Sequence, residues 1–198
     1  MTRQVVLVPG LWMPAAAMAF LARALRTYEL RVFTYRGRAC HERNIEALAR
    51  FAGDGACLVG HSLGGVLIYD MLARHPEVRA DGVVLLGAPV RGCFAGRRFG
   101  RAAVGRWMMG ACCSLWAERE ARWQRPAPLG VVAGTRPVGL GRLFGALPGP
   151  NDGVVRVEET TVEGMADCAL VRQGHSMLIV SHSVSALVAR FLARGAFA

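Results

Sequence analysis

Short apolar runs alternate with segments of helical character along this chain, and the alternation limits the possible fold more than any other feature. The apolar runs have the length of buried strands. Because a strand, a helix and a second strand in succession form a parallel unit, the pattern predicts an α/β fold with a doubly wound, mostly parallel sheet of about six strands. The predicted strands are Val5–Val8, Leu30–Phe33, Ala56–Val59, Val83–Leu86, Leu129–Ala133 and Cys168–Val171, and the predicted helices include Ala15–Arg26, Glu42–Phe51 and the run from Ser62 to His75.

Size and composition are those of one compact domain. The chain has 198 residues, of which 53% are hydrophobic and 19% charged, so it buries a core and is not disordered. We therefore predict a single domain over residues 1–198. All 24 basic residues are arginines, and with 14 acidic residues they give a net charge of +10. No aromatic-interleaved basic stripe or nucleic-acid motif accompanies this charge, so we interpret it as a composition bias and expect no nucleic-acid partner.

The sequence carries no sign of export or of a membrane span. The first apolar run stops at Pro9-Gly10, too early for a signal peptide, and the longest uncharged stretch, Gln173–Ala189, holds several serines and histidines. The six cysteines lie at irregular positions without a Cys-x-x-Cys pair, which predicts neither a disulfide framework nor a zinc site. We expect a cytoplasmic protein that is not transmembrane and uses no metal or organic cofactor.

The segment from 90 to 126 interrupts the alternation of strands and helices. It is too long for a simple crossover, and it has eight arginines against two glutamates. Its apolar residues recur at helical spacing, which predicts an apolar stripe with basic flanks. The stripe comprises Trp107, Met108, Ala111, Cys112, Leu115 and Trp116. Two interpretations stay open: a helix packed on the sheet, or a cap or lid over a pocket, whose apolar face meets acyl chains or a lipid surface.

The segment Gly60-His61-Ser62-Leu63-Gly64 joins a predicted strand to a predicted helix. A serine on such a tight turn needs small residues two positions before and after it, because larger side chains would collide with the strand and the helix. Gly60 and Gly64 meet this requirement. Ser62 is therefore the candidate nucleophile. The alternative is a passive serine that caps the helix.

A serine hydroxyl is a weak nucleophile at neutral pH and needs a base, which a carboxylate in turn orients. In sites built on this kind of turn, the acid follows a late strand and the histidine follows the last one. His175 lies just beyond the last predicted strand and is the candidate base. His182 lies in an apolar helical run, and His75 lies at the far end of the helix that begins at Ser62.

Asp152 lies between the last two predicted strands, where the chain order of serine, acid and histidine places the acid. The alternative interpretation is that Asn151-Asp152-Gly153 only forms a turn, because these residues tolerate turn geometry. Other candidates for the acid are Glu158, Glu159, Glu163 and Asp167, and after them Asp81.

A serine nucleophile also needs N–H donors for the oxyanion that forms on the acyl group. The backbone N–H of Leu63, directly after the serine, is the first candidate. The second comes from the loop Pro9–Met13, where the N–H of Leu11 is favoured over that of Trp12. Pro9 has no N–H to offer.

These motifs together resemble the α/β-hydrolase superfamily, in particular its small lipase- and esterase-like members. The resembling segments are Val6–Trp12, Gly60–Gly65, Leu86–Pro89, Asn151–Val155 and Gly174–Ser176. The resemblance implies a reduced α/β-hydrolase fold that begins at what is the third strand of a full-length member. The chain departs from the usual lipase pattern in one respect, since Pro9-Gly10 stands where His-Gly is common.

The resemblance implies a serine hydrolase that cleaves carboxylic esters through a covalent acyl-enzyme formed on Ser62. A thioesterase or an acyltransferase uses the same triad, and a non-catalytic binding protein of this fold is a further alternative. We expect Trp12, Trp107 and Met108 to line the substrate pocket. We expect a small-molecule acyl ester as the substrate, and the 90–126 segment is a candidate contact for an anionic lipid or an acyl carrier.

Overall fold

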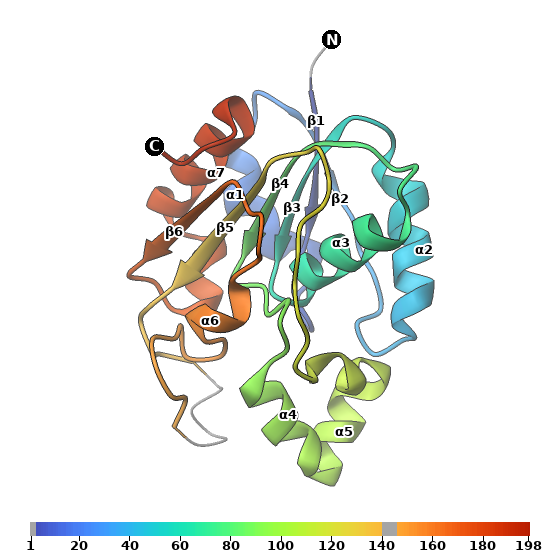
Figure 1. The fold of residues 1–198 in the computed structure, drawn as a ribbon, viewed down its shortest axis with the longest axis vertical. Coiled ribbons are helices and arrows are strands. Elements are labelled where there is room, and N and C mark those ends of the chain that lie inside the picture. The colour runs from blue at the N-terminus through green and yellow to red at the C-terminus, as the bar shows by residue number, and fades with distance from the viewer. Residues whose placement is uncertain (1–2, 140–145) are drawn as a thin grey trace.

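The computed structural model describes residues 3–139 and 146–198, and these form a six-stranded sheet in which every pair of neighbouring strands is parallel (Figure 1). The strand order is β2-β1-β3-β4-β5-β6. The strands are β1 (Gln4–Val8), β2 (Glu29–Val32), β3 (Ala56–His61), β4 (Ala80–Leu86), β5 (Leu129–Gly134) and β6 (Asp167–Val171). Each overlaps one of the predicted apolar runs, so the predicted α/β fold with a parallel sheet is confirmed.

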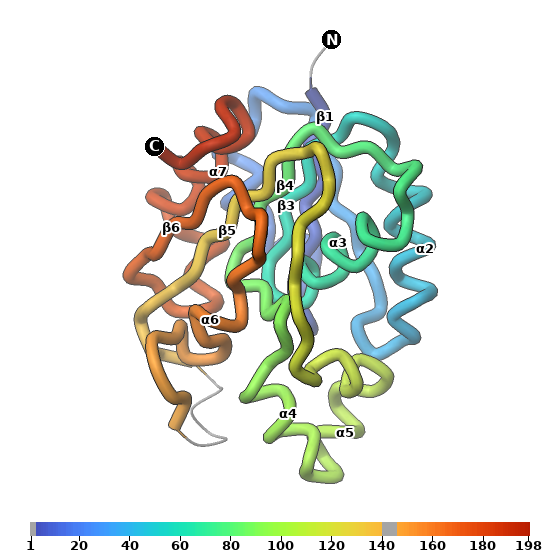
Figure 2. The backbone as a smooth tube through the Cα atoms, in the orientation of Figure 1, coloured from blue at the N-terminus to red at the C-terminus, as the bar shows by residue number. Residues whose placement is uncertain are grey.

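Helices cover both faces of the sheet, as Figures 1 and 2 show. Helices α1 (Ala19–Ala24) and α7 (His182–Arg194) pack on one face, and α2 (His41–Ala52) and α3 (Leu63–Arg74) pack on the other. Successive side chains of a strand point to opposite faces, so Val5 and Leu7 join one buried cluster while Val6 and Val8 join the other. Both faces of β1 are therefore buried, which explains its continuous apolar run.

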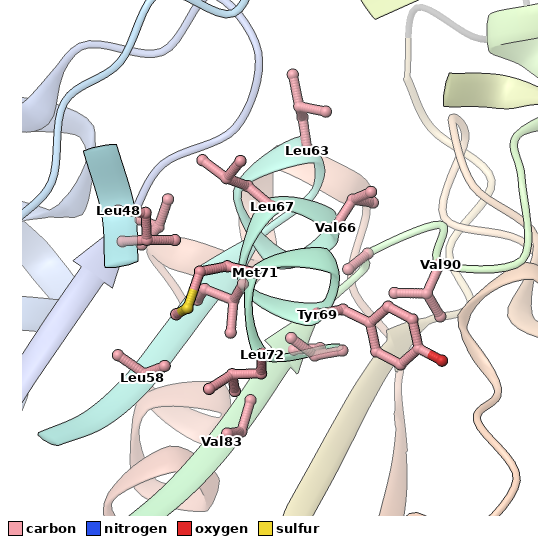
Figure 3. Close-up of a cluster of buried hydrophobic side chains, with 14 of the residues drawn as sticks. Leu48, Leu58, Leu63, Val66, Leu67, Tyr69, Met71, Leu72, Val83 and Val90 are labelled. Carbon is pink, nitrogen blue, oxygen red and sulfur yellow. The ribbon is translucent and has the colours of Figure 1, made fainter. Parts of the chain in front are cut away.

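Helix α3 is apolar on almost every side. Figure 3 shows its buried side chains between strand residues such as Leu58 and Val83 and the α2 residue Leu48. A helix with this composition belongs to the interior of a protein. Its packing fixes the position of its first turn, and Ser62 lies directly before that turn.

The segment from 90 to 126 does not form one continuous helix. It contains α4 (Phe94–Arg101), α5 (Ala103–Met109) and the 3₁₀ helix η2 (Gly110–Trp116), at the end of the molecule where the strands finish (Figure 1). Gly110 has φ 59° and separates α5 from η2. The expected stripe is therefore broken, because Trp116 is buried whereas Trp107 is 68% exposed.

The remaining elements are short. The predicted helix Ala15–Arg26 is divided into the 3₁₀ helix η1 (Ala15–Met18) and α1, and α6 (Val157–Thr160) and the 3₁₀ helix η4 (His175–Ile179) flank β6. Within residues 3–139 and 146–198, no helix combines the length and the apolar character that crossing a membrane requires.

Candidate active site

Ser62 lies on a sharp turn between β3 and α3. Its backbone has φ 52° and ψ −124°, a conformation that L-residues rarely adopt. The Ser62 N–H donates to the carbonyl of Leu86 on the neighbouring strand at 2.9 Å. The turn is thus attached both to the sheet and to a buried helix, and these two attachments maintain the strained backbone conformation of Ser62.

The glycines around Ser62 have no room for a side chain. A Cβ at Gly64 would lie 2.3 Å from the carbonyl oxygen of Val8, and a Cβ at Gly60 would lie 2.6 Å from the Cα of Gly65. Gly65 is equally crowded, since its Cβ would lie 2.5 Å from that of Ala88. The crowding expected from the sequence at Gly60 and Gly64 is present, and it extends to a third glycine.

A chain of hydrogen bonds joins the three candidate catalytic side chains. The distance from His175 Nε2 to Ser62 Oγ is 2.9 Å, and the distance from His175 Nδ1 to Asp152 Oδ2 is 2.7 Å. Because the Asp152 carboxylate accepts a hydrogen bond, Nδ1 carries the proton, and Nε2 is then free to accept from the serine. His175 and Asp152 are both buried.

The carboxylate of Asp152 is held in one orientation by its own loop. Its Oδ1 accepts hydrogen bonds from the backbone N–H groups of Val154 at 3.0 Å and Val155 at 2.7 Å, which leaves Oδ2 for His175. The Asp152 carbonyl also accepts from the His175 N–H at 2.9 Å. The preceding residue, Asn151, accepts from the Gly153 N–H through its side-chain oxygen at 3.0 Å. Asn151-Asp152-Gly153 therefore forms a turn, as the alternative interpretation expected, and the same turn also orients the carboxylate of Asp152 toward His175.

Gly87, at the end of β4, faces the His175–Asp152 pair. A Cβ at this position would lie 3.1 Å from Asp152 Oδ2 and 3.2 Å from His175 Nδ1, and φ at Gly87 is 55°. Any side chain would thus press on the hydrogen bond between these two residues. In the sequence, Gly87 belongs to the Leu86–Pro89 segment of the resemblance, which predicts no role for it at the site.

His61 is a buried residue of this site that sequence analysis did not identify. Its Nε2–H donates to the carbonyl of His175 at 3.0 Å, and the two imidazole rings lie 4.8 Å apart between centroids. Burial, reinforced by the nearby His175, lowers the pKa of His61 to about 3, so the ring is neutral at physiological pH. Its other nitrogen, Nδ1, is buried and has no partner among the described residues.

The loop that carries Leu11 packs against the serine turn. A Cβ at Gly10 would lie 3.1 Å from the Cβ of Ser62 and 3.0 Å from His61 Nδ1. The Tyr35 hydroxyl donates to the carbonyl of Pro9 at 3.0 Å and so orders the loop where a histidine is common in lipases. Leu63 is the first residue of α3, and its N–H has no acceptor within that helix.

The predicted pocket residues lie at the same end of the molecule but in different surroundings. The indole N–H of Trp12 donates to the carbonyl of Met108 at 3.3 Å, which joins the Leu11 loop to α5. Trp12 has φ 62° and is 54% exposed. Trp107 points outward, with the Arg38 guanidinium 5.0 Å from the centroid of its ring. The structure thus brings Trp12 and Met108 together and leaves Trp107 at the surface.

The other candidate acids and bases have partners elsewhere. The ring of His182 packs on that of Phe20 at 4.8 Å. Glu159 is buried, which raises its pKa, and it accepts from the Phe94 N–H at 2.5 Å. The remaining candidates make the following contacts: Glu158 with Arg156, Glu163 with Arg122, Asp167 with the N–H of Phe197, and Asp81 with Arg3. The described residues include no group of three or more histidine, cysteine, aspartate or glutamate side chains able to hold a metal ion.

Comparison with known proteins finds similarity at the level of structure. No protein-family model matches the sequence, and no curated protein sequence matches it. The chain is similar to a mature lipase of Bacillus licheniformis, with 16% identity, a TM-score of 0.66, and 98% of this chain and 92% of the lipase covered. For an aryl esterase of Burkholderia cenocepacia, the identity is 14%, the TM-score is 0.65, and the coverage is 98% and 91%.

A thioesterase domain, NocB of the nocardicin cluster, is similar over 98% of this chain and 95% of the domain, with 15% identity and a TM-score of 0.60. At such identities the similarity concerns the fold and not the activity. These structures, of lipases, esterases and thioesterase domains, share the α/β-hydrolase fold. The chain therefore has the α/β-hydrolase fold.

Proposed function

We propose that this protein is a serine hydrolase that cleaves carboxylic esters. The observation that carries the proposal is the hydrogen-bonded chain from Ser62 through His175 to Asp152, with the serine on a strained turn. A serine that only capped α3 would have no need of a buried imidazole and a buried carboxylate arranged in series. The lipase and esterase folds among the structural neighbours support the same assignment.

The proposed reaction follows from the positions of these atoms. Ser62 Oγ attacks the acyl carbonyl while its proton moves to His175 Nε2, and Asp152 Oδ2 stabilises the imidazolium that forms. The N–H groups of Leu63 and Leu11 stabilise the oxyanion of the tetrahedral intermediate. The intermediate collapses to an acyl-enzyme, and the proton on Nε2 leaves with the alcohol. Water then attacks the acyl-enzyme by the same route and regenerates Ser62.

Two features refine the proposal. The segment from 90 to 126 acts as a cap beside the site, because Trp12 in the Leu11 loop is hydrogen-bonded to the carbonyl of Met108 in α5. The protein acts in the cytoplasm, since its irregularly spaced cysteines suit a reducing compartment.

A thioesterase activity is the second candidate, favoured by the similarity to a thioesterase domain and by a triad that does not discriminate oxygen from sulfur esters.

Hydrolysis of p-nitrophenyl esters, from acetyl to palmitoyl, tests the proposal. We expect turnover by the wild type and a loss of at least about a thousandfold in Ser62→Ala, because the covalent step is removed. Ser183→Ala, which alters an exposed serine on α7, serves as the matched control and keeps full activity. Equal activity of the wild type and Ser62→Ala would contradict the proposal. Turnover of acyl thioesters alone would favour the thioesterase.

A further inference from the structure

Helix α5 exposes apolar side chains at the end of the molecule that holds Ser62. Val104 is 57% exposed and Trp107 is 68% exposed, and they lie three residues apart on the same face of the helix. Trp12, 54% exposed, is joined to this helix by its hydrogen bond to the carbonyl of Met108. We name Trp12, Val104 and Trp107, with the arginines described next, the α5 surface.

The α5 surface is basic and has no acidic residue of its own. Residues 82–117 contain five arginines and neither aspartate nor glutamate. Arg101 and Arg106 are exposed on α4 and α5, and the exposed Arg38 packs its guanidinium over the Trp107 ring. Among the described residues, none of these three arginines forms an ion pair with a carboxylate. In contrast, Arg97 on α4 is paired with Glu118 at 2.5 Å.

The exposed indoles lie beside guanidinium groups that pair with no carboxylate among the described residues, although Arg106 also donates to the carbonyls of Gly100 and Arg101. At a membrane surface, tryptophan lies at the level of the lipid headgroups, and arginine binds lipid phosphates. A protein interface also buries tryptophan and arginine, so binding of an acidic carrier protein is one of the outcomes that the test below distinguishes. We propose that the α5 surface docks on an anionic lipid bilayer, with the serine site facing the lipid. This interaction goes beyond the proposed ester hydrolysis and does not depend on it.

Co-sedimentation with lipid vesicles tests the proposal, using phosphatidylcholine vesicles with and without phosphatidylglycerol. The Ser62→Ala protein is used, so that failure of the catalytic proposal has no effect on the result. We expect binding to the anionic vesicles only. The binding should weaken as salt is added, because screening reduces the attraction of arginine to phosphate. A blue shift of the tryptophan fluorescence should accompany it.

Variants locate the binding surface. In the Ser62→Ala background, Trp107→Gln should reduce the fluorescence shift, of which Trp12 keeps a part, and Arg101→Gln should weaken binding about fivefold. The matched controls Leu170→Gln and Arg194→Gln change an exposed leucine on β6 and an exposed arginine in the last turn of α7, and they should bind like the parent. All four positions are exposed, and circular dichroism checks that each variant is folded.

Three results would overturn the proposal. The first is equal binding to neutral and anionic vesicles, and the second is no binding at low salt. The third is a loss of binding in the two control variants as large as that in the α5 variants. Binding of an acidic carrier protein without binding to vesicles would assign the α5 surface to that other partner instead.

Discussion

His61 connects three parts of the site through one buried, neutral ring. Its Nε2–H donates to the carbonyl of His175, whose N–H already donates to Asp152, so the backbone of the candidate base is held on both sides. The Nδ1 edge of the same ring faces Gly10 of the Leu11 loop. Since His61 directly precedes Ser62, we infer that it is a positioning residue for the imidazole of His175.

Two substitutions of His61 distinguish the contribution of its hydrogen bond to activity from the contribution of its side-chain volume. His61→Leu fills the space but cannot donate to the His175 carbonyl, so we expect kcat for ester hydrolysis to fall up to about a hundredfold with little change in KM. His61→Gln retains an N–H donor and should recover much of the loss. Steady-state kinetics of both variants, with folding checked by circular dichroism, measures the difference. Equal activity of the two variants would contradict the positioning role.

The pH dependence of stability gives these variants a second readout. The pKa of His61 is about 3 in the folded chain, below its ordinary value of 6.5. Between these pH values the unfolded chain binds a proton that the folded chain does not, so this group lowers the free energy of unfolding as the pH falls from 6.5 toward 3. Neither glutamine nor leucine titrates there. Urea unfolding at neutral and at acidic pH should therefore show a smaller loss of stability in both variants than in the wild type.

The sequence predicts those residues of the candidate site that belong to local patterns. Ser62 is identified by the spacing of its glycines, and Asp152 and His175 are identified by their places after late strands. His61 was missed because its partner is a backbone carbonyl 114 residues away, and no sequence pattern encodes such a contact. The outward orientation of Trp107 was missed for a related reason. Helical spacing shows which side chains share one face of a helix, but it does not show whether that face packs on the protein or is exposed to solvent.

At the scale of elements, Asp70 joins α2, α3 and the chain that follows η2. Its Oδ2 lies 2.8 Å from His41 Nε2, and its Oδ1 lies 2.8 Å from Arg119 Nη1. The carboxylate is buried, and Arg119 also donates from Nε to the carbonyl of Val90 at 2.7 Å. This junction attaches Val90 and Arg119, both in the 90–126 segment, to the helix that begins after Ser62.

Asp70→Ala should destabilise the fold because it leaves His41 and Arg119 without their shared partner. The loss of a partner in a buried pair costs about 3 kcal/mol. Asp54→Ala, which removes the exposed pair with Arg79, is the matched control and should cause a much smaller change. Urea unfolding of the two variants measures the difference in the free energy of unfolding. Losses of equal size would show that the Asp70 junction contributes no more than a surface ion pair.

The elements differ in how well the sequence predicts them. The six strands were identified because each one is a short apolar run, and burial on both faces of a parallel sheet produces that signal. The 90–126 segment was not resolved into α4, α5 and η2. Gly110 ends α5 by adopting φ 59° against the backbone of Arg38, and that contact comes from a loop far away in the sequence.

At the scale of the whole molecule, the parallel sheet explains why distant segments form one site. The carboxyl ends of parallel strands meet at one edge, and the loops that follow them supply the site's components. The contributions are Leu11 after β1, Ser62 after β3, Gly87 after β4, Asp152 after β5 and His175 after β6. The α5 surface lies at the same end (Figure 1), so the proposed lipid contact and the proposed chemistry share one pole of the protein.

The most direct test of the central claim is labelling with a fluorophosphonate, followed by mass spectrometry of the peptides. An activated serine attacks the phosphorus and displaces fluoride, whereas an ordinary serine does not react. We expect a single labelled residue, Ser62, with no labelling of Ser62→Ala and much slower labelling of His175→Ala. An unlabelled wild type, or a label on a serine other than Ser62, would contradict the assignment of Ser62 as the activated nucleophile.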